Sequence, residues 1–137
     1  MDIKGNVTSL KSEIKTLKEK HNITHDITIC AATKYVGVKE MKGLLDAGIN
    51  HFGENRVQDF LHKKEQIQDS NIIWHFIGSL QSNKVKKMIN SISYLHSLDR
   101  ESLAKEINKY RNNILDCFVE VNCSQESTKH GLHPNNV

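Results

Sequence analysis

Short apolar runs alternate with segments of helical periodicity between residues 27 and 124, and this alternation limits the fold more than any other feature. Apolar runs of a few residues bounded by polar ones are typical of buried strands, whereas apolar residues spaced three and four apart are typical of amphipathic helices. The connections are short, and the only proline is Pro134. Strands that alternate with helices favour an α/β fold with a parallel sheet. The expected strands are 27–34, 49–55, 72–78, 92–98 and 116–124.

A further helix is expected before the first strand. Its apolar side chains recur every three or four residues in a segment rich in Lys, Glu and Ser, so one face should pack against the rest of the domain. Gly48 is placed to end the helix after the first strand in a left-handed conformation, and Asp99 is placed to cap the helix after the fourth strand. The apolar stripe of the N-terminal helix consists of Ile3, Val7, Leu10, Ile14 and Leu17.

The chain has the length and composition of one globular domain, with 137 residues of which 37% are apolar and 26% charged. No apolar run approaches the roughly 18 residues that span a bilayer, and the first residues lack the apolar segment of a signal peptide. The cysteines Cys30, Cys117 and Cys123 all fall in strand-like runs, which predicts buried, reduced thiols. These features favour a cytoplasmic protein without a membrane partner.

Two groups of lysines raise the question of nucleic-acid binding. Lys84, Lys86 and Lys87 form one group and Lys63 and Lys64 the other, while the formal net charge is only +3. No aromatic residues are interleaved with these lysines for stacking on bases, so solvated helix faces are the favoured interpretation. We therefore expect no nucleic-acid partner.

The 8 histidines raise the question of a metal site. His130 and His133 beside Cys123 are the best group, but the sequence has neither a Cys-x-x-Cys nor a His-Glu-x-x-His motif, and we expect no metal ion. His75 lies within the third apolar run. It is either a core histidine with satisfied hydrogen bonds or a residue that faces a ligand.

Lys34 stands at the end of the first expected strand. Alternation along the strand places Ile27 and Ile29 on one face, and the small residues Cys30 and Ala32 on the other face together with Lys34. A lysine over small residues can be partly desolvated, which favours the neutral amine and makes it a usable Schiff-base nucleophile. Taken by itself, however, the segment favours a solvated lysine that closes a strand.

Polar residues end the other expected strands as well. In parallel β/α folds the C-terminal ends of the strands share one mouth, where ligands bind. Each polar side chain could therefore reach a common ligand, or could instead cap a helix or bind a loop. Glycines near the strand ends leave room for a flat ligand or a neighbouring backbone. The strand ends are Thr33-Lys34, Gly53-Glu54-Asn55, Ile77-Gly78-Ser79, Ser97-Leu98-Asp99 and Asn122-Cys123-Ser124.

Four blocks of sequence, at residues 31–34, 51–58, 74–84 and 96–99, are recognisable in this order, and the match continues through Val121-Asn122 and residues 126–132. The most specific stretches are Gly53-Glu54-Asn55-Arg56 and Trp74-His75-Phe76-Ile77-Gly78. The chain resembles the pyridoxal-phosphate homeostasis proteins, which are single-domain relatives of the N-terminal barrel of alanine racemase. The resemblance implies a partial (β/α)8 TIM barrel of that type, with about five β/α units after an N-terminal helix.

The same resemblance implies a function and a site. It implies a protein that binds pyridoxal 5'-phosphate (PLP) for intracellular PLP and vitamin B6 homeostasis, is not an enzyme, and holds the cofactor as an aldimine on Lys34. Asn55, His75 and Ser97 match neighbouring positions in the barrel lumen, and Lys129 matches a lysine near the cofactor mouth. The implied cofactor-binding residues are Lys34, Asn55, His75, Ser97, Asn122 and Lys129.

We expect residues 1–137 to form the N-terminal part of a PLP-binding TIM-barrel domain, with residues 125–137 as a flexible tail. A complete barrel needs about 200 residues or more and commonly builds its phosphate site from the loops after strands 7 and 8, so weak PLP binding is expected here. The open edges of a partial barrel favour self-association. Two alternatives stay open: a racemase-like PLP enzyme, for which the sequence offers no second domain, and a shortened chain that has lost cofactor binding.

Overall fold

The structure, a computed structural model, describes residues 2–137. Strands and helices alternate after α1 as far as β5, as the alternation of apolar runs predicts. Of two short 3-10 helices, η1 directly follows α4 and η2 lies near the C-terminus. The elements are α1 (Ile3–Lys20), β1 (Cys30–Ala32), α2 (Val38–Asp46), β2 (His51–Glu54), α3 (Val57–Gln66), β3 (Ile73–Phe76), α4 (Ser82–Met88), η1 (Ile89–Ser91), β4 (Tyr94–Leu98), α5 (Glu101–Tyr110), β5 (Asp116–Val119) and η2 (Pro134–Asn136).

The strands form one parallel sheet of 5 strands in chain order, β1-β2-β3-β4-β5. One row of register partners crosses the whole sheet through Ala32, Gly53, His75, Tyr94 and Asp116. Each β/α unit thus adds a strand beside the preceding one, as in the wall of a β/α barrel. β1 and β5 are the two edges, and within residues 2–137 each pairs with a single strand.

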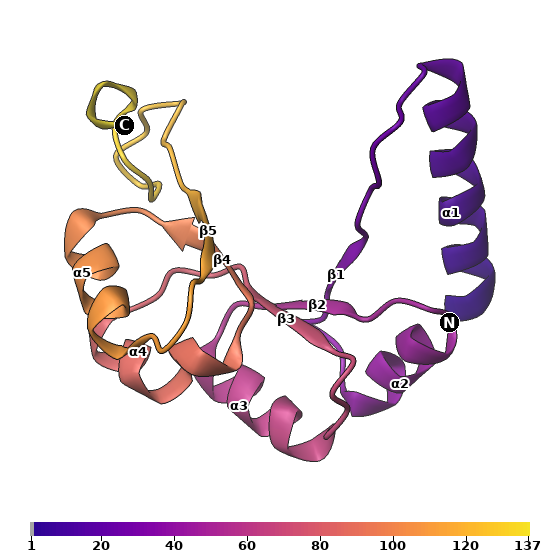
Figure 1. The fold of residues 1–137 in the computed structure, drawn as a ribbon, viewed down its shortest axis with the longest axis horizontal. Coiled ribbons are helices and arrows are strands. Elements are labelled where there is room, and N and C mark those ends of the chain that lie inside the picture. Colours follow the sequence, from indigo (N-terminus) through magenta and orange to yellow (C-terminus); the bar gives the residue numbers. More distant parts are fainter. Residues whose placement is uncertain (1) are drawn as a thin grey trace.

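Helices α2 to α5 lie along one face of the sheet, which we call the helix face, and none of them covers the opposite, open face (Figure 1). Period-two alternation directs Phe52 and Trp74 to the helix face, where the ring of Trp74 meets that of Phe60 on α3 at 5.3 Å between centroids. Burial of these side chains between sheet and helices is the main stabilising contribution to the fold. The core residues here are Met41, Phe52, Phe60, Trp74, Phe76, Leu80, Val85, Met88, Ile89, Leu95, Leu103 and Ile107.

Helix α1 packs against α2, and its other end projects beyond the sheet (Figure 1). Val7 is buried, whereas Leu10 and Leu17 are exposed, so only part of the predicted apolar stripe is covered. Lys11 donates hydrogen bonds of 3.2 Å to the backbone oxygens of Ala47 and Gly48, at the end of α2. None of the helices in residues 2–137 is long and apolar enough to cross a membrane.

The first strand is shorter than its apolar run predicts. β1 contains only Cys30–Ala32, and Lys34 lies in a turn rather than in the strand. The amide of Thr33 still pairs with the backbone oxygen of Gly53 at 3.0 Å, but the Val36 amide then bonds back to the Thr33 oxygen at 3.1 Å. This bond closes a turn and ends the extended conformation before Lys34.

Three further expectations require correction. Asp99 does not cap α5; the N-cap is Arg100, whose guanidinium binds the Asp99 carboxylate at 2.6 Å and thereby uses the acceptor that a cap requires. Lys63 does not lie on a solvated helix face; it is buried and paired with Glu54. Cys123 is exposed, because β5 ends at Val119, before that residue. The expected left-handed end of α2 at Gly48, by contrast, is confirmed by its φ of 78°.

The segment after β5 returns toward the sheet. Val121 and Leu132 form an isolated parallel bridge, supported by bonds of 2.8 Å from the Asn122 amide to the Leu132 oxygen and from the Leu132 amide to the Glu120 oxygen. Residues 122–131 form the loop between the two partners of this bridge. The flexibility expected for 125–137 stays a prediction.

Candidate functional site

Lys34 occupies the second position of the turn from Thr33 to Val36, directly after β1. The turn lies at the C-terminal end of the strand, the end at which ligands bind in parallel β/α folds. The Lys34 side chain is half-buried, and its Nζ lies 5.1 Å from the ring centroid of the exposed Tyr35. The amine therefore stands on a short, fixed loop with an aromatic ring beside it.

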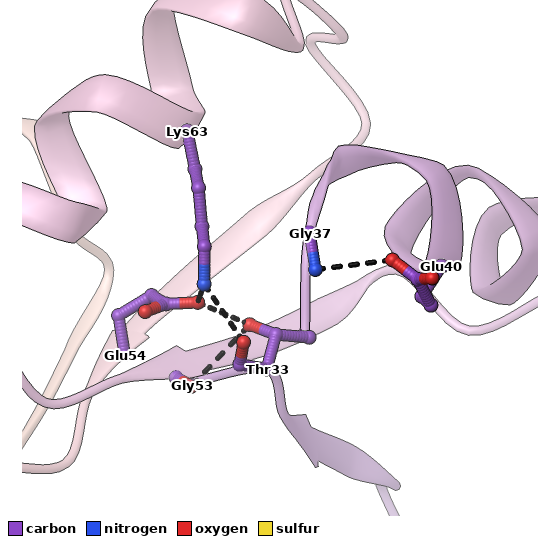
Figure 2. Close-up of polar contacts among 6 residues, drawn as sticks. All are labelled: Thr33, Gly37, Glu40, Gly53, Glu54 and Lys63. Carbon is purple, nitrogen blue, oxygen red and sulfur yellow. Dashed lines mark hydrogen bonds and ion pairs between the residues drawn. The ribbon is translucent and has the colours of Figure 1, made fainter. Parts of the chain in front are cut away.

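A buried polar network holds the start of this turn (Figure 2). The Lys63 Nζ on α3 donates to the Thr33 backbone oxygen at 2.8 Å and to Glu54 Oε1 at 2.7 Å. The Thr33 hydroxyl donates to the same carboxylate oxygen at 2.6 Å. Thr33 and Glu54 are fully buried, so these bonds form in a medium that strengthens them and makes their loss costly.

The other end of the loop is fixed as well. The Glu40 carboxylate on α2 accepts a hydrogen bond of 3.0 Å from the Gly37 amide, which is the half of a capping box that a glycine N-cap allows (Figure 2). An acidic side chain in the first turn is also favoured by the positive end of the helix dipole. The backbone that carries Lys34 is therefore anchored before and after the residue.

Three histidines form a hydrogen-bonded chain on the open face. His51 Nδ1 lies 2.9 Å from His75 Nε2, and His75 Nδ1 lies 2.9 Å from His96 Nε2, so the chain links β2, β3 and β4. The ring of Tyr94 stacks on His75 with centroids 4.5 Å apart. The ring of Phe118 packs on His96 at 4.8 Å. His75 is thus buried with both ring nitrogens in hydrogen bonds, and it lies on the open face; that it faces a ligand stays a prediction.

Burial sets the protonation of the three hydrogen-bonded histidines. Desolvation, together with the positive charges that His96 and His51 can carry, lowers the pKa of His75 to about 4. Burial also lowers the pKa of His51 and of His96. Near neutral pH the three rings are therefore neutral, and His75 donates one of its two bonds and accepts the other. Within residues 2–137 no group of three or more His, Cys, Asp or Glu side chains is arranged to hold a metal ion.

Asn55 and Ser97 meet at the backbone of Gly78. The Ser97 hydroxyl on β4 donates to the Gly78 oxygen at 2.5 Å. A Cβ at Gly78 would lie 2.7 Å from the Asn55 Cα, so a side chain there is excluded by the neighbouring strand end. At Gly53 the adjacent space is filled by Ile77, whose side chain would lie 3.2 Å from an added Cβ. The space beside each glycine is therefore occupied by a neighbouring part of the protein, the Asn55 backbone at Gly78 and the Ile77 side chain at Gly53.

Asn122 and Lys129 belong to the segment after β5. The side-chain amide of Asn122 donates from Nδ2 to the backbone oxygen of Glu126 at 2.9 Å, and its Oδ1 accepts from the Ser124 hydroxyl at 3.2 Å. Lys129 is exposed. Because β1 and β5 are opposite edges of the sheet, three strands separate Lys34 from these two residues.

Sequence reasoning identified the turn lysine but missed the residues that hold it. The lysine clusters predict a solvated face for Lys63, although its position three residues after the core residue Phe60 is a signal that it shares the buried side of α3. No motif in the sequence points to His51 or His96 as members of a site. Their signal is positional, because both lie with His75 on the open face of adjacent strands.

No protein-family model matches the chain. It is 44% identical over 112 residues to the pyridoxal phosphate homeostasis protein of Aquifex aeolicus, which covers 80% of this chain and 49% of that protein. It is 35% identical over 136 residues to the protein of the same name from Buchnera aphidicola subsp. Schizaphis graminum, which covers 96% of this chain and 59% of that one. The chain thus spans about half to three fifths of the length of these curated relatives.

Solved structures show the same fold. PipY of Synechococcus elongatus PCC7942 without PLP superposes with a TM-score of 0.85 at 25% identity, over 98% of this chain and 60% of PipY. PipY with PLP bound gives a TM-score of 0.72 over 88% of this chain and 58% of PipY. The 5 parallel strands and their helices match this part of the PipY barrel, which confirms the predicted partial barrel. The chain belongs to the pyridoxal phosphate homeostasis protein family.

Proposed function

We propose that this chain binds PLP as an aldimine on Lys34 and serves PLP homeostasis in the cytoplasm without catalysing a reaction of its own. The observation that carries the proposal is the position of Lys34, on an anchored turn at the C-terminal end of the first strand. Family membership and the PLP bound to the similar PipY support it. The free thiols of Cys30, Cys117 and Cys123 are consistent with a reducing compartment.

The proposed bond requires only an amine and an aldehyde. The neutral Nζ of Lys34 adds to the aldehyde carbon, and the aldehyde oxygen leaves as water, so that a carbon–nitrogen double bond remains and nothing is oxidised or reduced. Lys34 fits this step because its side chain enters no hydrogen bond or ion pair with the described residues and is half-buried. The adjacent Lys63 does not fit, because its ammonium is held by Glu54 and Thr33.

The six implied site residues divide into two groups by what their polar atoms already do. Within residues 2–137 the side chains of Lys34, Asn55 and Lys129 enter no hydrogen bond, and we propose that these three contact the cofactor directly. His75 and Ser97 have their polar atoms in protein hydrogen bonds, as does Asn122, and we assign them a supporting role. Charge-assisted bonds from the Lys129 ammonium would suit the phosphate.

A titration with PLP tests the proposal. The unaltered chain should develop the yellow absorbance of an aldimine, which borohydride reduction removes while fixing the cofactor to the chain. Lys34→Ala should abolish both signals, whereas the control Lys42→Ala, an exposed lysine on α2, should retain them. Absence of any aldimine at high PLP concentration would contradict the proposal and favour a chain that has lost cofactor binding.

The racemase-like alternative has a separate test. Racemisation uses two acid/base groups on opposite faces of the cofactor, and we assign no second group here. With PLP and L-alanine supplied, we expect no D-alanine above the background of free PLP. Formation of D-alanine that Lys34→Ala removes would instead favour the enzyme.

Self-association completes the proposal. The edge strand β5 carries Phe118 at 57% and Val119 at 49% exposure, and Ile114 just before it is 93% exposed. An edge strand with exposed apolar residues is a template for pairing with another chain. We therefore propose that copies associate through the edges β1 and β5.

A further inference from the structure

We propose that Glu54 and Lys63 form a positioning pair that fixes the turn carrying Lys34, so that its amine is presented to the aldehyde while the Lys63 amine is withheld. The inference rests on the proposed function for the identity of the ligand. It goes beyond that function in assigning a role to two buried charged residues that do not touch the cofactor.

The pair acts on the backbone of the residue before Lys34. The Thr33 oxygen accepts from Lys63 Nζ at 2.8 Å and from the Val36 amide at 3.1 Å, so the same carbonyl closes the turn and is held by α3. Without Lys63 this carbonyl would keep only its bond within the turn. The start of the turn would then be held to the sheet only by the Thr33 amide and hydroxyl, and the position of Lys34 would be less firmly fixed.

Glu54 is needed because a lysine is not buried alone. Lys63 is 9% exposed and Glu54 is fully buried, with 2.7 Å between Nζ and Oε1. A buried charge requires a partner of opposite sign and further hydrogen bonds. Glu54 Oε1 supplies the charge and also accepts from the Thr33 hydroxyl at 2.6 Å, so β1, β2 and α3 are joined at one oxygen atom.

One feature of the pair is not explained by the stability of the fold. Glu54 Oε2 is buried and has no hydrogen-bond partner among the described residues. A carboxylate kept in the core with half of its acceptors unused is costly compared with an apolar side chain of similar size. Retaining it makes sense where the geometry it imposes on Thr33 is used, and that geometry is the direction of the neighbouring Lys34.

The ion pair also distinguishes the amine of Lys63 from that of Lys34. Lys63 is buried, and its Nζ is held by a carbonyl and a carboxylate, so an aldehyde cannot approach it without breaking these bonds. Lys34 has no such partners within residues 2–137. The arrangement thus directs the aldehyde to Lys34.

Two readouts test the inference, one with PLP and one without. The first is the affinity for PLP, followed by aldimine absorbance. The second is hydrogen exchange at the Val36 amide, which reports how firmly the turn is closed and does not depend on the cofactor. The first variants are Lys63→Met and a double variant, Glu54→Gln with Lys63→Met, in which both charges are absent. Two further variants change Thr33: Thr33→Val removes the hydroxyl, and Thr33→Ser retains it.

Two controls separate positioning from general destabilisation. Lys64→Met removes a lysine from the same helix without touching the network, and Leu103→Ala weakens the core on α5, away from the turn. The double variant serves if Lys63→Met alone does not fold, because it leaves no unpaired buried charge.

We expect Lys63→Met and the double variant to bind PLP about tenfold to a hundredfold more weakly, as a displaced reactive group does. Exchange at Val36 should accelerate by about tenfold or more in both variants. Thr33→Ser should keep the PLP affinity and the Val36 exchange rate of the unaltered chain. Thr33→Val should weaken PLP binding and accelerate Val36 exchange, as Lys63→Met does. Both controls should leave the affinity and the exchange rate unchanged.

A folded double variant with unchanged PLP affinity and unchanged Val36 exchange would overturn the inference. If the unaltered chain forms no aldimine, the proposed function fails. Val36 exchange then decides the positioning role alone, and acceleration in the double variant but not in Lys64→Met supports it.

Discussion

The Lys63 ammonium on α3 donates a hydrogen bond of 2.8 Å to the backbone oxygen of Thr33, the residue that precedes Lys34. A helix on the outer side of the sheet thereby fixes the loop at its mouth. The connection passes through buried atoms only, since Thr33 is fully buried and Lys63 nearly so. The anchored backbone of Thr33 is therefore directly next to Lys34, the residue that we propose binds the cofactor.

The first prediction concerns the stability of the buried pair. Lys63→Met leaves the Glu54 carboxylate buried without its cation and should lower the free energy of unfolding by about 3–5 kcal/mol. The double variant with Glu54→Gln should lose clearly less, because no unpaired charge remains. Urea unfolding measures both, and Lys64→Met should stay within about 0.5 kcal/mol of the unaltered chain. Equal losses in the single and double variants would contradict the ion-pair interpretation.

The histidine chain predicts a pH dependence of stability. The pKa of His75 falls from 6.5 to about 4 on folding, so between these pH values the unfolded chain binds more protons than the folded one. The free energy of unfolding should therefore be at its full value above about pH 6.5 and should decrease by roughly 1–3 kcal/mol as the pH falls toward 4. His51 and His96, whose pKa values burial also lowers, act in the same direction.

Unfolding by urea at several pH values from 7.5 downward measures this slope. His75→Gln should flatten it, whereas His133→Gln, which replaces an exposed histidine, should leave it unchanged. A slope that is the same in all three chains would show that the histidine chain does not titrate as the structure requires.

Gly78 predicts a steric limit between two strand ends. An added Cβ would overlap the backbone of Asn55, so Gly78→Ala must displace β2 or β3 and should cost about 1–3 kcal/mol or more. Gly37→Ala is the matched control, because a Cβ there has only the flexible Glu40 carboxylate at 3.4 Å. Thermal unfolding of the two variants is the measurement. Similar melting temperatures for both would place the Asn55 backbone further from Gly78 than the structure does.

The exposed edge predicts assembly. Light scattering should give a mass above that of one chain for the unaltered protein, and Val119→Lys should shift the mass toward the monomer, because a charge on an edge strand opposes pairing. Lys109→Ala, a change on the exposed part of α5, should not alter the mass. A well-behaved monomer with a cooperative melt would contradict association through the edges.

The order of strands and helices was predictable because it depends on the spacing of apolar residues that are near one another in the sequence. Apolar runs and helical spacing predict β1 to β5 and α1 to α5, although not the two short 3-10 helices, and the structure changes mainly the ends of the predicted elements. Lys34 shows why the ends moved: a local apolar pattern continues to residue 33, but a turn bond from Val36 to Thr33 decides where the strand stops. Asp99 shows the same limit, since its partner is the adjacent Arg100 rather than the helix end.

The polar network was not predictable, because its members meet only through the fold. Glu54 and Lys63 lie nine residues apart on a strand and the following helix, a separation with no fixed geometry before the two elements pack. The histidine chain depends likewise on the register of β2, β3 and β4. The sequence therefore indicates Lys34, the residue proposed to bind the cofactor, more readily than it indicates the residues that hold its turn.

Mapping the site of reduction tests the assignment of Lys34 most directly. The unaltered chain is incubated with PLP, reduced with borohydride and digested, and the peptides that carry the cofactor are identified by mass spectrometry. We predict that the pyridoxyl group is found on Lys34 at low PLP concentration, with Lys63 unmodified. Modification spread over the exposed lysines, or absent from Lys34, would contradict the assignment.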